Sequence, residues 1–142
     1  MKAKKINLNN TLEQLENDIW EDPGEVTRLV NTIYRLRKKP LREFTTEDLR
    51  ITIGQQVGLA YLIPLAIDIL KKDILSEGDY YPGDLLKNVL EIEAGYWSKN
   101  KNQWEIVRDL FNENRDKFVP DSDHKNILMS FERFRQIDIF ND

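Results

Sequence analysis

Few residues of this 142-residue chain have side chains suited to catalysis. Cysteine is absent and His124 is the single histidine, so disulfides and thiolate-ligated metal sites are excluded. No serine lies at a spacing from His124 that is typical of a nucleophile and its base. The sequence motifs of phosphate-binding loops, zinc proteases and serine hydrolases do not occur. The sequence therefore predicts a protein that is not an enzyme and that uses neither a metal nor a cofactor.

Carboxylates gather between residues 68 and 84, beside two adjacent tyrosines. A solvated edge is the first interpretation and a partner-binding patch follows closely. A metal site ranks below both, because the spacing of the acids matches no EF-hand loop. Tyrosines in a loop beside acids favour a protein interface. The candidate partner-binding residues are Asp68, Asp73, Glu77, Asp79, Tyr80, Tyr81 and Asp84.

A second charged segment, RLRKKPLR at residues 35–42, could contact phosphate. Its cations are Arg35, Arg37, Lys38, Lys39 and Arg42. The chain as a whole has a net charge of −4, which disfavours general nucleic-acid binding because phosphate neutralisation supplies most non-specific affinity. A cation cluster at the end of a helix is the preferred interpretation. A small nucleic-acid-binding regulator that uses this segment remains the alternative.

The scaffold for these groups is organised around the segment from Ile51 to Leu75, which has the lowest charge density in the chain. A helix at about residues 59–72 carries aliphatic side chains on nearly every side, so its neighbours must cover it. Pro64 is tolerated if the helix starts near Ala60, because first-turn amides are unpaired; a single long helix kinked at Pro64 is the alternative. Polar residues interrupt the segment, which argues against a membrane span.

Shorter amphipathic helices are expected on both sides of this segment, bounded by proline or glycine and by caps such as a Thr11–Gln14 capping box and the Thr45 hydroxyl. They are expected at about residues 11–19, 25–38, 46–55, 82–92, 97–116 and 122–134. Their apolar stripes, which are expected to face the core, include Ile19, Val26, Leu29, Val30 and Trp104. No alternation typical of strands persists. The predicted fold class is all-α: one compact domain spanning residues 1–142, with six to eight helices around the buried helix 59–72. Residues 1–10 are a candidate flexible segment, and the apolar residues Ile137, Ile139 and Phe140 are expected to dock.

Several blocks of the sequence resemble the immunity proteins of bacterial contact-dependent growth inhibition systems. The blocks are LENDIWEDP, LRKKPL, FTTEDLRITIGQQ, YLIPLAIDIL and EGDYYPGDLL, which fall within residues 11–97. No block is a catalytic motif, so the resemblance depends on their joint occurrence and order.

The resemblance implies a function. Such proteins bind the toxic C-terminal domain delivered by a neighbouring cell and neutralise it in the cytoplasm. Many of these toxins are nucleases, with RNases favoured here, and their substrate clefts are basic. An acidic inhibitor would complement such a cleft, since charge complementarity raises association rate and specificity. The expected partner is thus a cognate toxin domain with a basic contact surface. Neither a membrane nor nucleic acid is an expected partner, and a monomer is favoured.

Overall fold

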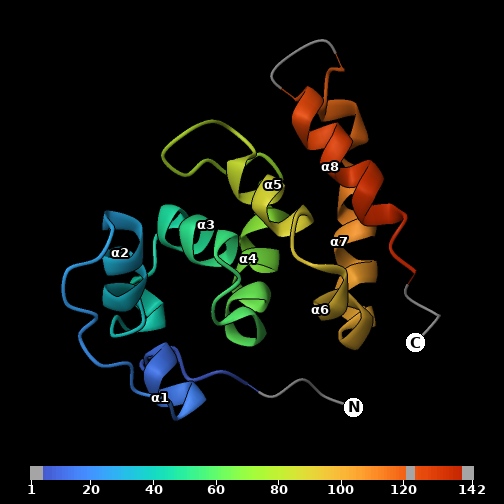
Figure 1. Ribbon diagram of the computed structural model, residues 1–142. Helices are drawn as coiled ribbons and strands as arrows, with labels where there is room; N and C mark the ends of the chain where they lie inside the picture. The colour runs from blue at the N-terminus through green and yellow to red at the C-terminus, as the bar shows by residue number, and fades with distance from the viewer. Residues whose placement is uncertain (1–4, 121–123, 139–142) are drawn as a thin grey trace.

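The computed structural model describes residues 5–120 and 124–138, and the regular secondary structure of this part consists of helices joined by loops (Figure 1). The eight α-helices of these residues are α1 (Leu12–Glu16), α2 (Arg28–Leu36), α3 (Thr46–Gly54), α4 (Leu59–Lys72), α5 (Asp84–Leu90), α6 (Ala94–Lys99), α7 (Lys101–Glu113) and α8 (Lys125–Arg135). Two short 3-10 turns lie at Leu41–Glu43 and Arg115–Lys117. The all-α prediction is confirmed.

Helix α4 lies in the middle of the molecule and packs against α3, α5 and α7 (Figure 1). Its fully buried side chains are Leu62, Ile63, Ala66, Ile67 and Leu70. The expectation of burial on every side was too strong, because Leu65 and Ile69 are only half-buried and Asp68 is exposed. One side of the central helix therefore remains open to solvent.

The break between α3 and α4 falls at Gly58. Its φ of +65° is a left-handed conformation that favours glycine. A Cβ at this position would also lie only 2.8 Å from the Leu12 side chain, so glycine lets α1 approach the start of α4. Helix α4 then runs through Pro64, which lies in its second turn and not in the first turn as expected. Proline has no amide hydrogen, so the Ala60 carbonyl, four residues earlier, lacks its usual helical donor. Ala60 is exposed, so a water molecule can donate in its place.

The segment expected as one helix at residues 97–116 is two helices, α6 and α7, that meet at Asn100. The Asn100 side-chain amide donates to the Tyr96 carbonyl at 2.8 Å, a local bond that competes with helix continuation. Helix α7 packs its aromatic side against α8, where the Trp104 indole donates to the Phe134 carbonyl at 3.1 Å. The predicted core position of Trp104 is confirmed.

The N-terminal helices are shorter than the sequence suggests. Helix α1 has the predicted Thr11 capping box, but it ends at Asn17, whose φ of 52° is left-handed. Helix α2 begins only after its cap, Thr27, and among the described elements it packs chiefly against α3 (Figure 1). The expected core positions at Ile19, Val26, Leu29 and Val30 are therefore exposed, by 76%, 42%, 39% and 37%.

The chain ends also differ in part from expectation. The carbonyls of Leu8 and Asn10 accept hydrogen bonds from the amides of Arg42 and Leu41, so this part of the N-terminal segment is fixed to the bundle. Ile137 packs against the core as predicted, whereas residues 139 and 140 lie outside the described part. No helix in the described part has the length and hydrophobicity of a membrane span.

The position of α4 predicts a stability difference between two leucines on it. Leu62 is fully buried and Leu65 is half-buried. We expect Leu62→Ala to lower the free energy of unfolding by about 3 kcal/mol, within the usual range for a core leucine. Leu65→Ala should cost clearly less. Urea titration of both variants measures the difference, and equal losses would contradict the observed orientation of α4.

Candidate functional site

Asp84 is the predicted site residue whose surroundings differ most from expectation. It is 3% exposed, at the first position of α5. Its carboxylate accepts hydrogen bonds from the backbone amides of Gly78 at 2.6 Å, Tyr80 at 3.1 Å and Tyr81 at 3.4 Å. Asp84 is therefore not a surface contact residue: its buried carboxylate fixes the loop at residues 76–83, and the backbone donors compensate its burial.

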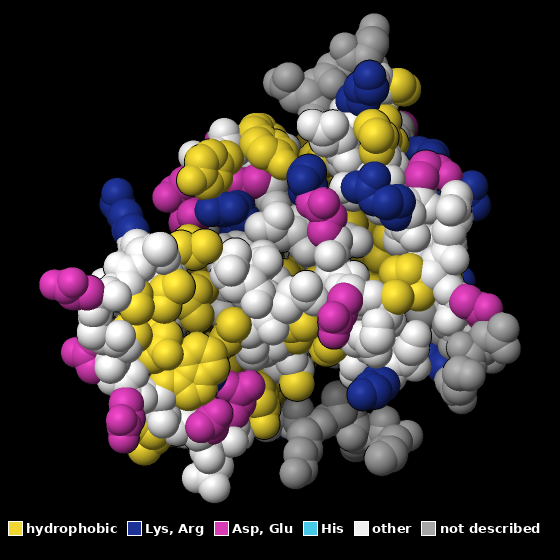
Figure 2. Space-filling model, viewed as in Figure 1, with side chains coloured by type: hydrophobic (Ala, Val, Ile, Leu, Met, Phe, Trp, Pro, Cys, Tyr) yellow, Lys and Arg dark blue, Asp and Glu magenta, His cyan; other side chains and the backbone are white. Residues whose placement is uncertain are grey.

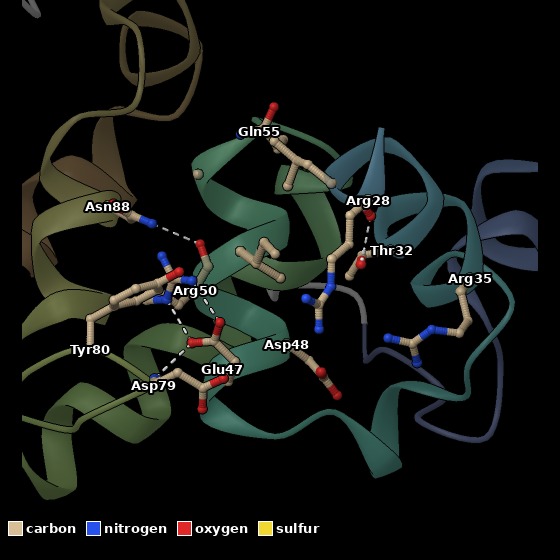
Figure 3. Close-up of a pocket in the computed structure, with 13 residues that line it drawn as sticks. Arg28, Thr32, Arg35, Glu47, Asp48, Arg50, Gln55, Asp79, Tyr80 and Asn88 are labelled. Carbon is tan, nitrogen blue, oxygen red and sulfur yellow. Dashed lines mark hydrogen bonds and ion pairs between the residues drawn. The ribbon is translucent and has the colours of Figure 1, made fainter. Parts of the chain in front are cut away.

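The same loop is attached to α3 by a second carboxylate (Figure 3). The Glu47 Oε1 atom accepts a bond from the Asp79 amide at 2.8 Å, and the Glu47 carboxylate also receives two bonds from Arg50 at 2.6 Å each. The Arg50 hydrogen bonds are the main cause that holds the pKa of Glu47 below its ordinary value. The Arg50 guanidinium stacks on the Tyr80 ring, 4.5 Å from its centroid. A tyrosine that is 71% exposed is thus held in a fixed position at the surface.

The structure places most of the other predicted residues on the surface. Asp68, Asp73, Glu77 and Asp79 are exposed, and Tyr81 is half-buried. Asp79, Tyr80 and Tyr81 share the loop that Asp84 fixes. Asp73 caps the end of α4, and Asp68 lies further back on that helix. The predicted acidic segment therefore exists as exposed carboxylates around one rigid loop, with Asp84 beneath it.

A polar groove of about 810 Å³ separates this loop from α2. Its central residues come from α3, with Arg28, Thr32 and Arg35 of α2 on one side and Asp79 and Tyr80 on the other (Figure 3). The charges that line it are mixed, and the groove contains no histidine, cysteine or serine. Such a lining can hold charged side chains of a partner, but it offers no nucleophile with a general base.

His124 takes a structural position. Its Nδ1 accepts a hydrogen bond from the Val119 amide at 3.1 Å, and its ring meets the edge of Phe118. It thereby links the residue before α8 to Val119 and Phe118. Within the part of the chain that the structure describes, no group of three histidine, aspartate or glutamate residues could hold a metal ion.

The basic segment at residues 35–42 does not form a free cationic patch. Arg37 is 1% exposed, and its guanidinium donates to the Glu16 carboxylate and to the Asp18 carbonyl. Lys38 pairs with Glu13 at 2.8 Å and Lys39 with Asp48 at 2.7 Å. The acids of the chain thus pair with three of the five cations, whereas Arg35 and Arg42 are exposed.

A third surface feature, which was not predicted from the sequence, lies between α1 and α2. Residues 6–27 contain six acids and no lysine or arginine. Two of the acids, Glu13 and Glu16, bind the basic segment; the remaining four are exposed. Figure 2 shows that hydrophobic side chains gather over α2 and the loop before it, with acidic side chains at the border. The run of acids is visible in the sequence. The net charge of the first 50 residues does not reveal it, because the basic segment at residues 35–42 offsets its negative charge.

A model of the family of CDI immunity proteins, where CDI is contact-dependent growth inhibition, matches residues 14–107. This span is about two thirds of the chain and runs from α1 into α7. The chain belongs to the CDI immunity proteins. The resemblance found in the sequence blocks is thereby confirmed, and a cognate toxin is the partner that an immunity protein requires. No curated protein matches the chain.

The buried guanidinium of this immunity protein predicts a large effect of a single substitution. Arg37→Ala removes a buried ion pair and the packing of the arginine stem, although the Glu16 side chain is 31% exposed and can be hydrated. We expect a loss of about 2–4 kcal/mol in the free energy of unfolding. Arg35→Ala, at an exposed position on the same helix, is the control and should change it by less than about 0.5 kcal/mol. Similar losses in the two variants by urea titration would contradict the pairing.

The carboxylates of Glu13 and Glu47 predict a loss of stability in acid. Hydrogen bonds from Lys38 and Arg50, respectively, lower the pKa of each below the ordinary value of 4.5. Their stabilising contribution is therefore complete above pH 4.5 and is lost as the pH falls from there through the folded-state pKa. Glu47→Gln should be less stable than the wild type at pH 7 and should lose less stability between pH 5 and pH 3. Glu21→Gln, at an exposed position, should keep the wild-type pH dependence. Urea titrations across this range make the comparison.

Proposed function

We propose that this immunity protein neutralises a nuclease toxin domain, with an RNase favoured, by covering its substrate-binding surface. The observation that carries the proposal is the set of exposed carboxylates around a rigid loop in a chain of net charge −4. A nuclease must attract phosphates, so its cleft is cationic, and an acidic surface is complementary to it. The proposed site of action is the cytoplasm, and the proposed active form is a monomer.

The proposed contact residues are Asp68, Asp73, Glu77, Asp79, Tyr80 and Tyr81. Exposed acids of this kind steer a cationic partner during approach. Tyr80 is suited to a central contact, because a tyrosine gives a large area and few rotatable bonds, and the Arg50 stack already restricts its ring. Asp84 has an indirect role: it keeps the loop backbone in the shape that presents these side chains.

The proposed mechanism is occlusion. A toxin domain seated on the loop would have its phosphate-binding surface covered by carboxylates, so that the negative charge of this chain takes the place of the substrate charge. This chain contributes no chemical step, in keeping with a groove whose lining contains no histidine, cysteine or serine. RNA incubated with the purified immunity protein alone should stay intact, and cleavage that co-elutes with the protein would overturn this mechanism.

Charge reversal tests the contact residues. The double variant Glu77→Lys, Asp79→Lys should bind the toxin domain encoded beside this gene with a slower association rate, and that rate should depend less on salt. The control Glu113→Lys, Asp116→Lys makes the same charge change at exposed positions at the end of α7. Association rates at several ionic strengths measure the effect, and circular dichroism verifies the fold.

The outcomes separate two kinds of failure. If the wild-type protein neither binds that domain nor protects RNA from it, the proposed function is wrong. If the wild type protects and the two double variants associate at equal rates, the function stands and the loop residues are the wrong contacts.

A further inference from the structure

An exposed apolar surface on α2 and the loop before it, beside the groove, points to a second part of the toxin contact. We propose that the α2 patch, defined as Ile19, Val26, Leu29 and Val30, is the hydrophobic anchor of toxin binding. It would receive an apolar projection of the toxin that is surrounded by lysine and arginine. This inference rests on the proposed function, because it takes a basic toxin domain as the partner.

The first argument is that the apolar stripe of α2 extends further toward the N-terminus than the part of it that other elements bury. Val26, Leu29, Val30, Ile33 and Leu36 follow helical spacing. Ile33 and Leu36 at the C-terminal end of the stripe are 5% and 0% exposed. The three residues before them are 37–42% exposed, and Ile19 in the preceding loop is 76% exposed. Isolated exposed apolar residues are common, but apolar side chains that gather over one helix and the loop before it, as in Figure 2, are typical of an interaction site.

The second argument is that the patch is rigid before any partner binds. The Trp20 ring packs on Tyr34 of α2 with 5.1 Å between centroids, and the Arg37 guanidinium lies 4.1 Å from the Trp20 ring centroid. The Trp20 amide donates to Glu13 at 3.0 Å. The loop that carries Ile19 is thus tied to both α1 and α2. A preordered surface loses little conformational entropy on binding, which favours its use as an anchor.

The third argument identifies the partner by charge. The acids around the α2 patch are Asp18, Glu21, Asp22 and Glu25, all exposed and without an ion pair in the described part of the chain. A partner seated on the patch would bring its own rim against these four carboxylates. A cationic rim is therefore favoured. A second copy of this chain is disfavoured, because these four carboxylates of the two copies would meet, whereas the cations Arg28 and Arg35 lie on the groove side of α2.

The fourth argument is that the α2 patch and the loop at residues 76–83 border the same groove. Leu29 lines the groove on the side of α2, and Tyr80 and Asp79 line it on the other side (Figure 3). One toxin domain could then contact the loop and the α2 patch together across the groove. In this arrangement the carboxylates accelerate association, and the apolar anchor slows dissociation.

Charged substitutions in the α2 patch, compared with a control pair elsewhere on the surface, test the proposed anchor. Val26→Asp with Val30→Asp places charge in the α2 patch, and Val119→Asp with Met129→Asp does the same at positions that are 49% and 47% exposed near α8. Binding is measured with the domain encoded beside this gene, recovered from the co-purified complex by denaturation and refolding. We expect the patch variant to dissociate at least about tenfold faster, the size of a hot-spot effect, with an unchanged melting temperature. The control should dissociate within about twofold of the wild type.

A second variant keeps the test decisive if the helix variant unfolds. Ile19→Asp alters the most exposed residue of the α2 patch, which lies outside any helix. This variant should also dissociate faster from the toxin domain. If the wild type binds and both patch variants dissociate at the wild-type rate, the inference is wrong while the proposed function stands. If the wild type does not bind the domain, both are wrong. A wild-type dimer that Val26→Asp with Val30→Asp converts to a monomer, with toxin binding unchanged, would assign the patch to self-association and overturn the inference.

Discussion

Burial of the apolar helix α4 is the constraint that fixes the arrangement of its neighbours. A helix with leucine and isoleucine on most of its sides is stable in water only when other elements cover it. Helices α3, α5 and α7 provide this cover. Because α3 and α5 also pack on each other beside α4, the loop between α4 and α5 must cross the end of α3. The position of the acidic loop therefore follows from how α4 is buried.

Two buried or partly buried charges then determine the shape of the surface. The Asp84 carboxylate collects three backbone amides of the loop, and the Arg37 guanidinium binds α1 and the loop that follows it. Each charge is costly to bury unless hydrogen bonds satisfy it, so each one forces a segment of irregular backbone to fold around it. The two surfaces proposed to meet the toxin are built on these two charges.

The ionic groups of this immunity protein divide into two sets with different uses. Glu13, Glu16, Asp48 and the basic segment neutralise one another within the fold. The acids of the loop at residues 76–83 and of the segment before α2 stay exposed. The net charge of −4 is therefore expressed locally on these two exposed acidic segments, while Arg37, Lys38 and Lys39 of the basic segment are held in ion pairs. Concentrated surface charge of one sign acts on association with a partner of the opposite sign.

The sequence by itself determined the all-α fold class, the approximate places of most helices and the family. Helical spacing located α4, hydroxyl and carboxamide side chains located the caps at Thr11 and Thr45, and the blocks of sequence within residues 11–97 indicated the immunity family. These features depend on neighbours in the chain, so local patterns report them. The residues that contact the toxin stay predictions.

Only the tertiary structure decided which side chains are covered and which charges are free. Val30 and Ile33 are equivalent in an apolar stripe, yet one is exposed and the other buried, because cover comes from a distant helix. Arg37 finds its carboxylate 21 residues away, and Asp84 finds its donors inside a folded loop. Helical periodicity fixes the side of a helix on which a residue lies. What packs against that side depends on contacts between segments far apart in the chain.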